Sequence, residues 1–172
     1  GPPQTDEPQA AASVDTYYAQ HTRGNTMTQL ASTSGEVVEL PDGYQVVGPY
    51  SEGLVMVRWL EASNDRWGVG TDGNFDYGFM DASGNLEIEV DDAAASIGLP
   101  AENDEGAALR CTPGAYFQED RAVLDCRYGA RGNEYHFSLV IDAQGSVVAW
   151  TGLDAGYMDV ESAASLPYTS FP

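Results

Sequence analysis

The chain has no lysine, so its 7 basic residues are all arginine, and they stand against 27 acidic residues. A formal net charge of −20 over 172 residues keeps a protein soluble and repels both phosphate backbones and anionic lipid headgroups. Nucleic acid is therefore excluded as an expected partner, whereas cations, basic proteins and neutral glycans stay open. The length allows one domain with a real core and is too short for two large ones.

Long apolar runs are also missing: nowhere do 18 apolar residues follow one another, which excludes a transmembrane helix. Residues 2–9 form instead a Pro/Gln/acid segment of the kind that tethers a domain to a cell surface. We expect residues 1–12 to be a disordered spacer or the remnant of a cleaved tag, and residues 13–172 to form a single β-repeat domain. The expected location is extracellular or at the surface of a bacterium, with a lipid or cell-surface tether at the N-terminus. The alternative is the cytoplasm of a halophile, because strong acidity is also an adaptation to high salt.

Cysteine is scarce, with Cys111 and Cys126 as the only two. An even number in an exported domain favours a disulfide, and closing a loop of about 16 residues is worth roughly 3 kcal/mol in the chain-entropy model. If residues 107–111 pair antiparallel with residues 121–126, the two cysteines come within bridging reach. Two buried free thiols are the alternative, and two cysteines are too few for a zinc site without further ligands.

What the sequence does contain is a repeated hairpin pattern. In residues 80–89 an apolar stretch meets an Asp-x-x-Gly turn, and the next strand alternates apolar and acidic side chains. The pattern recurs at residues 141–148 and, in weaker form, at residues 31–38. The three turns are expected near residues 32–35, 81–84 and 142–145. The predicted fold is all-β, with tandem antiparallel hairpins that form a small twisted sheet, barrel or sandwich and with little helix.

Individual segments add detail to this prediction. Leu54–Leu60 has apolar residues on both faces, which is typical of a central strand. One or two helical turns are expected over residues 91–97, with acids at the favoured end. Residues 11–20 fit a helix, although the Tyr17-Tyr18 pair suits a strand equally well.

The hairpins resemble a known family. Residues 49–57 (Pro-Tyr-Ser-Glu-Gly-Leu-Val-Met-Val) and 77–88 (Tyr-Gly-Phe-Met-Asp-Ala-Ser-Gly-Asn-Leu-Glu-Ile) are similar to the WG repeat of bacterial proteins. That repeat reads aromatic-Ser-Glu-Gly-Leu-Ala-x-Val and then Trp-Gly-Tyr-Ile-Asp-x-x-Gly-x-Val-Val-Ile. About three divergent copies cover most of residues 32–150, with Tyr77-Gly78 in place of the namesake pair. The resemblance implies tandem hairpins and a frequent link to bacterial surface or secreted proteins, and it supplies no agreed catalytic residues.

One carboxylate cluster has the spacing of a metal site. Asp72, Asn74 and Asp76 match the D-x-N-x-D pattern that opens a calcium loop. An EF-hand then requires glycine at position six and glutamate at position twelve, where this chain has Tyr77 and Ser83. A looser calcium site and a plain acidic turn are the two remaining interpretations, and no other cofactor is expected.

The candidate binding patch consists of four aromatic residues: Trp59, Trp67, Phe75 and Tyr77. Exposed rings on a rigid sheet form platforms for sugars or protein partners, although rings also pack between hairpins in repeat folds. The chain contains no P-loop, dinucleotide fingerprint or Gly-x-Ser-x-Gly elbow. We therefore expect a non-catalytic binding or structural module with a protein or glycan partner, and not an enzyme. The alternative is a carboxylate-dependent hydrolase of the glycosidase type.

Overall fold

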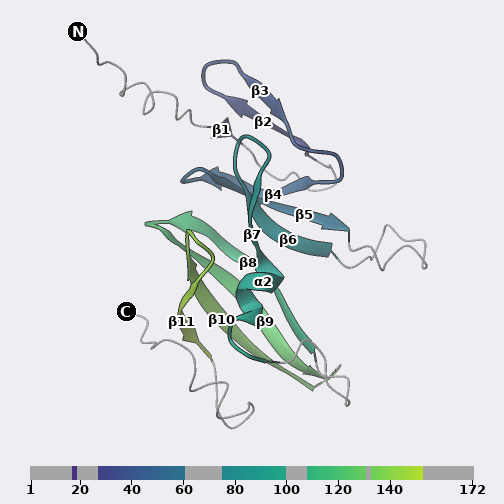
Figure 1. The fold of residues 1–172 in the computed structure, drawn as a ribbon, viewed down its shortest axis with the longest axis vertical. Coiled ribbons are helices and arrows are strands. Elements are labelled where there is room, and N and C mark those ends of the chain that lie inside the picture. Colours follow the sequence, from purple (N-terminus) through teal and green to yellow (C-terminus); the bar gives the residue numbers. More distant parts are fainter. Residues whose placement is uncertain (1–16, 19–26, 61–74, 100–107, 131–132, 153–172) are drawn as a thin grey trace.

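The computed structural model describes residues 17–18, 27–60, 75–99, 108–130 and 133–152 (Figure 1). The first sheet consists of β1 (Tyr17–Tyr18), β2 (Gln29–Ser32) and β3 (Val37–Glu39). The second sheet consists of β4 (Gln45–Ser51), β5 (Leu54–Leu60), β6 (Phe75–Met80) and β7 (Leu86–Glu89). The helix α2 (Val90–Ala95) follows β7. The third sheet consists of β8 (Ala108–Gln118), β9 (Arg121–Ala130), β10 (Asn133–Asp142) and β11 (Val147–Thr151).

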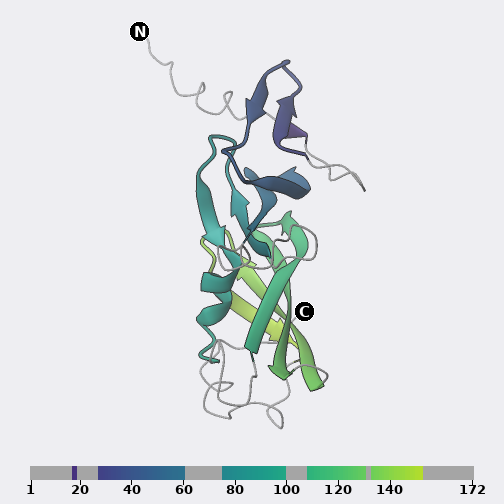
Figure 2. The ribbon, with the colours of Figure 1, turned by 90° about the vertical axis from the view of Figure 1, so that its right-hand side faces the viewer.

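The predicted all-β class is confirmed. Every strand pair is antiparallel and joins strands that follow each other in the sequence, as tandem hairpins require. Within the described ranges one short helix accompanies the strands, and the three sheets do not close into a barrel. The sheets follow one another along the long axis of the molecule, and α2 lies beside the second and third sheets (Figures 1 and 2). No helix in the part of the chain described here is long and apolar enough to cross a membrane.

The three predicted turns share one hydrogen-bond pattern. In each, a side-chain oxygen accepts the backbone N–H groups two and four residues later: Ser32 Oγ at 3.2 and 3.0 Å, Asp81 Oδ1 at 2.8 and 2.9 Å, and Asp142 Oδ1 at 2.9 and 3.0 Å. The glycine three residues after each of them has a φ of 94°, 89° and 83°, in that order, which glycine adopts without steric cost. The same local chemistry therefore reverses the chain three times.

The second sheet is buried on both faces. Val55 and Val57 of β5 belong to a core shared with the first sheet, whereas Met56 between them belongs to a core shared with the third sheet. Because successive side chains of a strand point to opposite faces, this confirms the prediction that Leu54–Leu60 is a central strand. The core toward the first sheet comprises Leu30, Leu40, Val46, Val55, Val57 and Met80.

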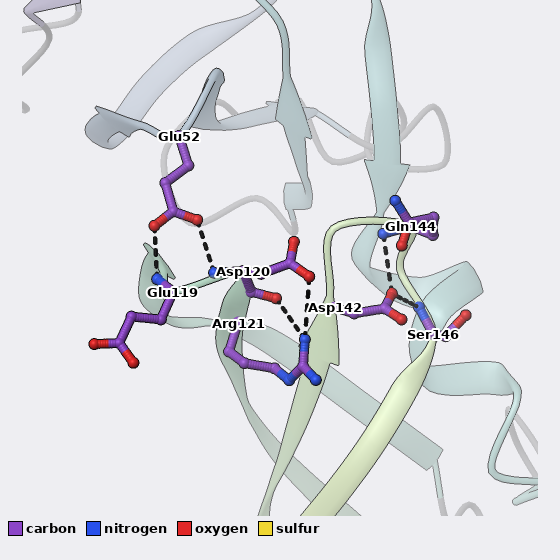
Figure 3. Close-up of polar contacts among 7 residues, drawn as sticks. All are labelled: Glu52, Glu119, Asp120, Arg121, Asp142, Gln144 and Ser146. Carbon is purple, nitrogen blue, oxygen red and sulfur yellow. Dashed lines mark hydrogen bonds and ion pairs between the residues drawn. The ribbon is translucent and has the colours of Figure 1, made fainter.

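The second and third sheets are joined by apolar and polar contacts. The rings of Phe79 and Phe117 meet edge to face with centroids 4.9 Å apart, and Ser51 Oγ donates a hydrogen bond of 2.7 Å to the Phe117 carbonyl oxygen. The Glu52 carboxylate accepts the backbone N–H groups of Glu119 at 2.6 Å and of Asp120 at 2.8 Å (Figure 3). This last contact, which we call the Glu52 clasp, ties the β4–β5 turn to the β8–β9 turn.

Two segments refine the local predictions. Tyr17–Tyr18 forms β1 and pairs with Ser32 and Ala31 of β2, so these two residues adopt the strand alternative and not the helix. The helical turns expected within residues 91–97 are present as α2.

The predicted disulfide is present. Cys111 of β8 lies directly opposite Cys126 of β9, with the two Cα atoms 4.1 Å apart, and their sulfur atoms are bonded. Both side chains are buried in the core between the second and third sheets. Antiparallel pairing of the two segments therefore brings the cysteines together as their positions in the sequence predict.

Candidate functional site: an aromatic groove at the end of the second sheet

A groove of about 430 Å³ opens at one end of the second sheet. Its volume lies within the range of roughly 300–1,000 Å³ that is typical of small-ligand sites. Three aromatic rings and one exposed aliphatic side chain give it an apolar surface, and an acid and an amide add polar groups. The lining residues are Asp42, Gly43, Tyr44, Gln45, Trp59, Leu60 and Phe75.

Local structure explains how these residues come together. Residues 41–44 form a tight turn in which the Tyr44 N–H donates to the Pro41 carbonyl oxygen at 3.2 Å, with Gly43 at a φ of 91°. The turn leads into β4, whose first residue, Gln45, pairs with Arg58 of β5. The far end of β5 pairs with β6, so that Leu60 lies opposite Phe75.

The aromatic rings are held by specific contacts. The rings of Tyr44 and Trp59 have centroids 5.2 Å apart and planes inclined by 56°. The Arg58 guanidinium carbon lies 3.9 Å from the centroid of the Phe75 ring, while its Nε donates to Gln45 Oε1 at 2.9 Å. A cation over an aromatic face is an attractive arrangement, and here it also orients the Gln45 amide. The groove is thus a preformed surface with fixed rings.

The groove combines an open apolar surface with one exposed acid. Leu60 is 48% exposed, so the apolar surface is open to solvent. Among the residues that the structure describes, Ser32 is the one polar or charged side chain that is buried, and no buried acid is among them. The carboxylate in the groove, Asp42, is exposed, whereas a glycosidase-type acid stands in an apolar pocket.

The predicted aromatic patch is divided by the structure. Trp59 and Phe75 line the groove together. Tyr77 packs against the core between the second and third sheets, as the alternative interpretation of the aromatic residues had it. Trp67 lies outside the described residues.

Five lining residues were not predicted from the sequence: Asp42, Gly43, Tyr44, Gln45 and Leu60. The sequence does contain a signal for these residues. The Pro-Asp-Gly turn lies just before β4, and because β4 and β5 pair antiparallel, the last residues of β5 lie next to this turn. The register of the two strands decides which of their residues lie opposite each other, and the sequence alone does not determine that register.

The calcium candidate stays a prediction. Asp76 lies in β6 opposite Trp59, whereas Asp72 and Asn74 fall outside the described residues. Over the described ranges, no three His, Cys, Asp or Glu side chains gather closely enough to hold a metal ion.

Comparison of the chain with family models, with curated proteins and with solved structures finds no match. The function is therefore argued from the geometry of the groove.

Proposed function

We propose that this protein is a non-catalytic binding module of an exported bacterial protein and that it binds a glycan in the groove at the end of the second sheet. The observation that carries this proposal is the pair of inclined rings, Tyr44 and Trp59, beside the polar groups of Asp42 and Gln45. Sugar rings present an apolar face to aromatic side chains and hydroxyl groups to amides and carboxylates. The net charge of −20 favours a neutral glycan at this site, because Asp42 repels an anionic one.

The dimensions of the groove favour a glycan over a protein partner. A stable protein interface buries about 800 Å² on each side and is centred on several large side chains in packed pockets. The groove of about 430 Å³ is lined by seven residues at the end of one sheet, which suits a few sugar units.

The proposed family is a divergent array of WG repeats. Support comes from the three turns with the same hydrogen bonds, at Ser32, Asp81 and Asp142. The Ser-Glu-Gly segment of the family pattern includes Glu52, whose carboxylate binds the turn of the following unit. A Cβ atom on Gly78, the glycine of the Tyr-Gly pair, would lie 2.5 Å from the Ile88 carbonyl oxygen, so close pairing of β6 with β7 requires glycine there. The disulfide supports export to an oxidising compartment.

Trp59→Ala tests the proposal. Tryptophan fluorescence and calorimetry would follow the titration of the wild-type protein with glucose, N-acetylglucosamine and xylose oligosaccharides of six units. We expect at least one series to bind and Trp59→Ala to lose about 5- to 30-fold in affinity, because a stacked ring contributes about 1–2 kcal/mol. Tyr116→Ala, which removes a 37% exposed ring on β8 that does not line the groove, is the matched control and should bind normally.

A second variant separates binding from folding. Trp59 packs against the core toward the first sheet, so its loss also affects stability. Asp42→Ala changes an exposed side chain of the turn and should weaken binding without lowering the melting temperature. Binding that is unchanged in both Trp59→Ala and Asp42→Ala, or the absence of binding to every oligosaccharide, would refute a glycan site in the groove. Release of reducing ends from an oligosaccharide would instead favour the hydrolase.

A further inference from the structure

A second concave region crosses the outer face of the third sheet. Two adjoining hollows of about 300 and 410 Å³ share Asp125, Cys126 and His136, so they form one trough that runs across β8, β9, β10 and the end of β11. The charged and polar side chains of the trough face away from the core, because they alternate along the strands with Cys111, Cys126 and Phe137, whose side chains are buried. It shares no residue with the groove of the second sheet.

One side of the trough is a row of basic side chains. Arg110 of β8 lies opposite Arg127 of β9, and Arg127 lies opposite His136 of β10. All three are exposed on the outer face. The whole chain has 7 arginines and 2 histidines against 27 acids, yet three of these nine groups stand side by side here.

Such a row is unfavourable for the folded chain by itself. Like charges directly opposite each other destabilise an antiparallel pair. Arg127 has a long ion pair with Glu134, with Nε and Oε2 3.7 Å apart, and half of the Arg127 side chain is exposed. Within the described ranges Arg110 and His136 form no hydrogen bond or ion pair with an acid, so two donors of the row are free to bind a ligand.

The neighbouring row supplies oxygen atoms. Thr112, Asp125 and Ser138 lie opposite one another on β8, β9 and β10 and point to the same face. Ser138 Oγ donates to Asp125 Oδ1 at 3.4 Å and not to His136, so these three residues do not have the order of a Ser-His-Asp triad. Hydroxyl and carboxylate oxygens in the row next to the guanidinium groups match a ligand that carries both hydroxyl groups and one acidic group.

We infer that the trough binds a saccharide with a single carboxylate, such as a terminal uronate. The guanidinium groups of Arg110 and Arg127 bind the carboxylate, since a planar fork of N–H groups matches a planar oxyanion. Asp125 accepts hydrogen bonds from the sugar hydroxyls and repels a doubly charged sulfate or phosphate. The net charge of −20 likewise disfavours a polyanion. A short ligand with one charge interacts mainly with the basic row, because charges more than about 8 Å away are screened at physiological salt.

The test uses the whole protein in NMR titrations with three probes: a disaccharide of glucuronate linked to glucose, its neutral counterpart cellobiose, and inorganic sulfate. We expect the disaccharide alone to shift the backbone amide signals of Arg110, Arg127 and His136 in a saturable way. The double variant Arg110→Gln/Arg127→Gln should lose at least about tenfold in affinity. Arg121→Gln, which removes an exposed arginine at the other end of β9, is the matched control and should stay within about twofold of the wild type.

Two further variants make the outcome unambiguous. Asp125→Asn removes the central negative charge and should raise the affinity for sulfate. If the double variant does not fold, Arg110→Gln replaces it, since Arg110 has no acidic partner among the described residues. Trp59→Ala should leave the affinity of the trough for the disaccharide unchanged. The experiment can therefore refute the trough without refuting the groove, and the reverse. Equal shifts with cellobiose, equal loss in Arg121→Gln, or sulfate binding as tight as that of the disaccharide would each overturn the inference.

Discussion

Removal of the Glu52 clasp is expected to loosen the joint between the second and third sheets. The Glu52 carboxylate accepts two short backbone hydrogen bonds, from Glu119 and Asp120 (Figure 3). Hydrogen bonds to charged groups contribute about 1.5–3 kcal/mol each when they are shielded from water, and less when they are exposed. Because Glu52 is exposed, we assign about 1 kcal/mol to each bond and about 2 kcal/mol to the clasp.

Glu52→Ala measures this contribution directly. For a chain of this size about 2 kcal/mol corresponds to a decrease of roughly 4–8 °C in the melting temperature. The measurement is thermal and urea unfolding followed by circular dichroism. High salt should change the effect little, since the acceptor binds backbone N–H groups and not an opposite charge.

Glu119→Ala is a closely matched control. Glu119 occupies the corresponding turn of the next unit and, like Glu52, is exposed. Its φ is 53° against 55° for Glu52, so both substitutions place alanine in the same left-handed backbone. The Glu119 side chain makes no such contact in the described part of the chain, and Figure 3 shows it pointing away from the joint. Glu119→Ala should therefore cost less than about 0.5 kcal/mol beyond the backbone effect that both variants share. Equal losses in the two variants would refute the clasp as a source of stability.

Two further predictions concern the turn at Asp81 and the disulfide. Partial burial raises the pKa of Asp81, but hydrogen bonds from the N–H and amide groups of Asn85 and from the N–H of Ser83 outweigh it and hold the pKa below its usual 3.8. A carboxyl group whose pKa is lowered by folding stabilises the folded state above the pKa of the unfolded state, and this contribution is lost as the pH falls through the folded pKa. Asp81→Ala should therefore cost about 1 kcal/mol of unfolding free energy at pH 7 and less in urea titrations at about pH 3. A loss that does not depend on pH would contradict this prediction. Non-reducing mass analysis after alkylation should find no free thiol, and Cys111→Ser/Cys126→Ser should lose about 3 kcal/mol of unfolding free energy; two alkylated cysteines in the wild type would refute the bridge.

The hairpins could be predicted from the sequence because their causes are local. The Asp-x-x-Gly turn at Asp81 needs a side-chain acceptor and a glycine three residues later, and both act within five residues of chain. Alternation in the strand after it assigns Ile88 to the core and Glu89 to solvent without reference to any other segment. The disulfide followed in the same way from one antiparallel pairing, and that pairing also places Arg110 opposite Arg127.

The candidate sites were decided by the tertiary structure. Trp59 and Tyr77 are both aromatic and both on central strands, yet Trp59 lies at the core toward the first sheet and lines the groove, whereas Tyr77 packs against the core toward the third sheet. The difference arises because the other two sheets stack on opposite faces of β5 and β6, and the groove opens where β5 ends and β6 begins. Periodicity identifies which side chains share a face, but not which face another sheet will cover.

The sequence by itself therefore determined the all-β class, the three turns and the cysteine pair, since each depends on residues that are neighbours along the chain or in one hairpin. The tertiary structure decided the groove around Trp59, the Glu52 clasp and the placement of His136 beside two arginines. These depend on strand register and on sheet stacking, where a shift of one residue moves every side chain to the other face.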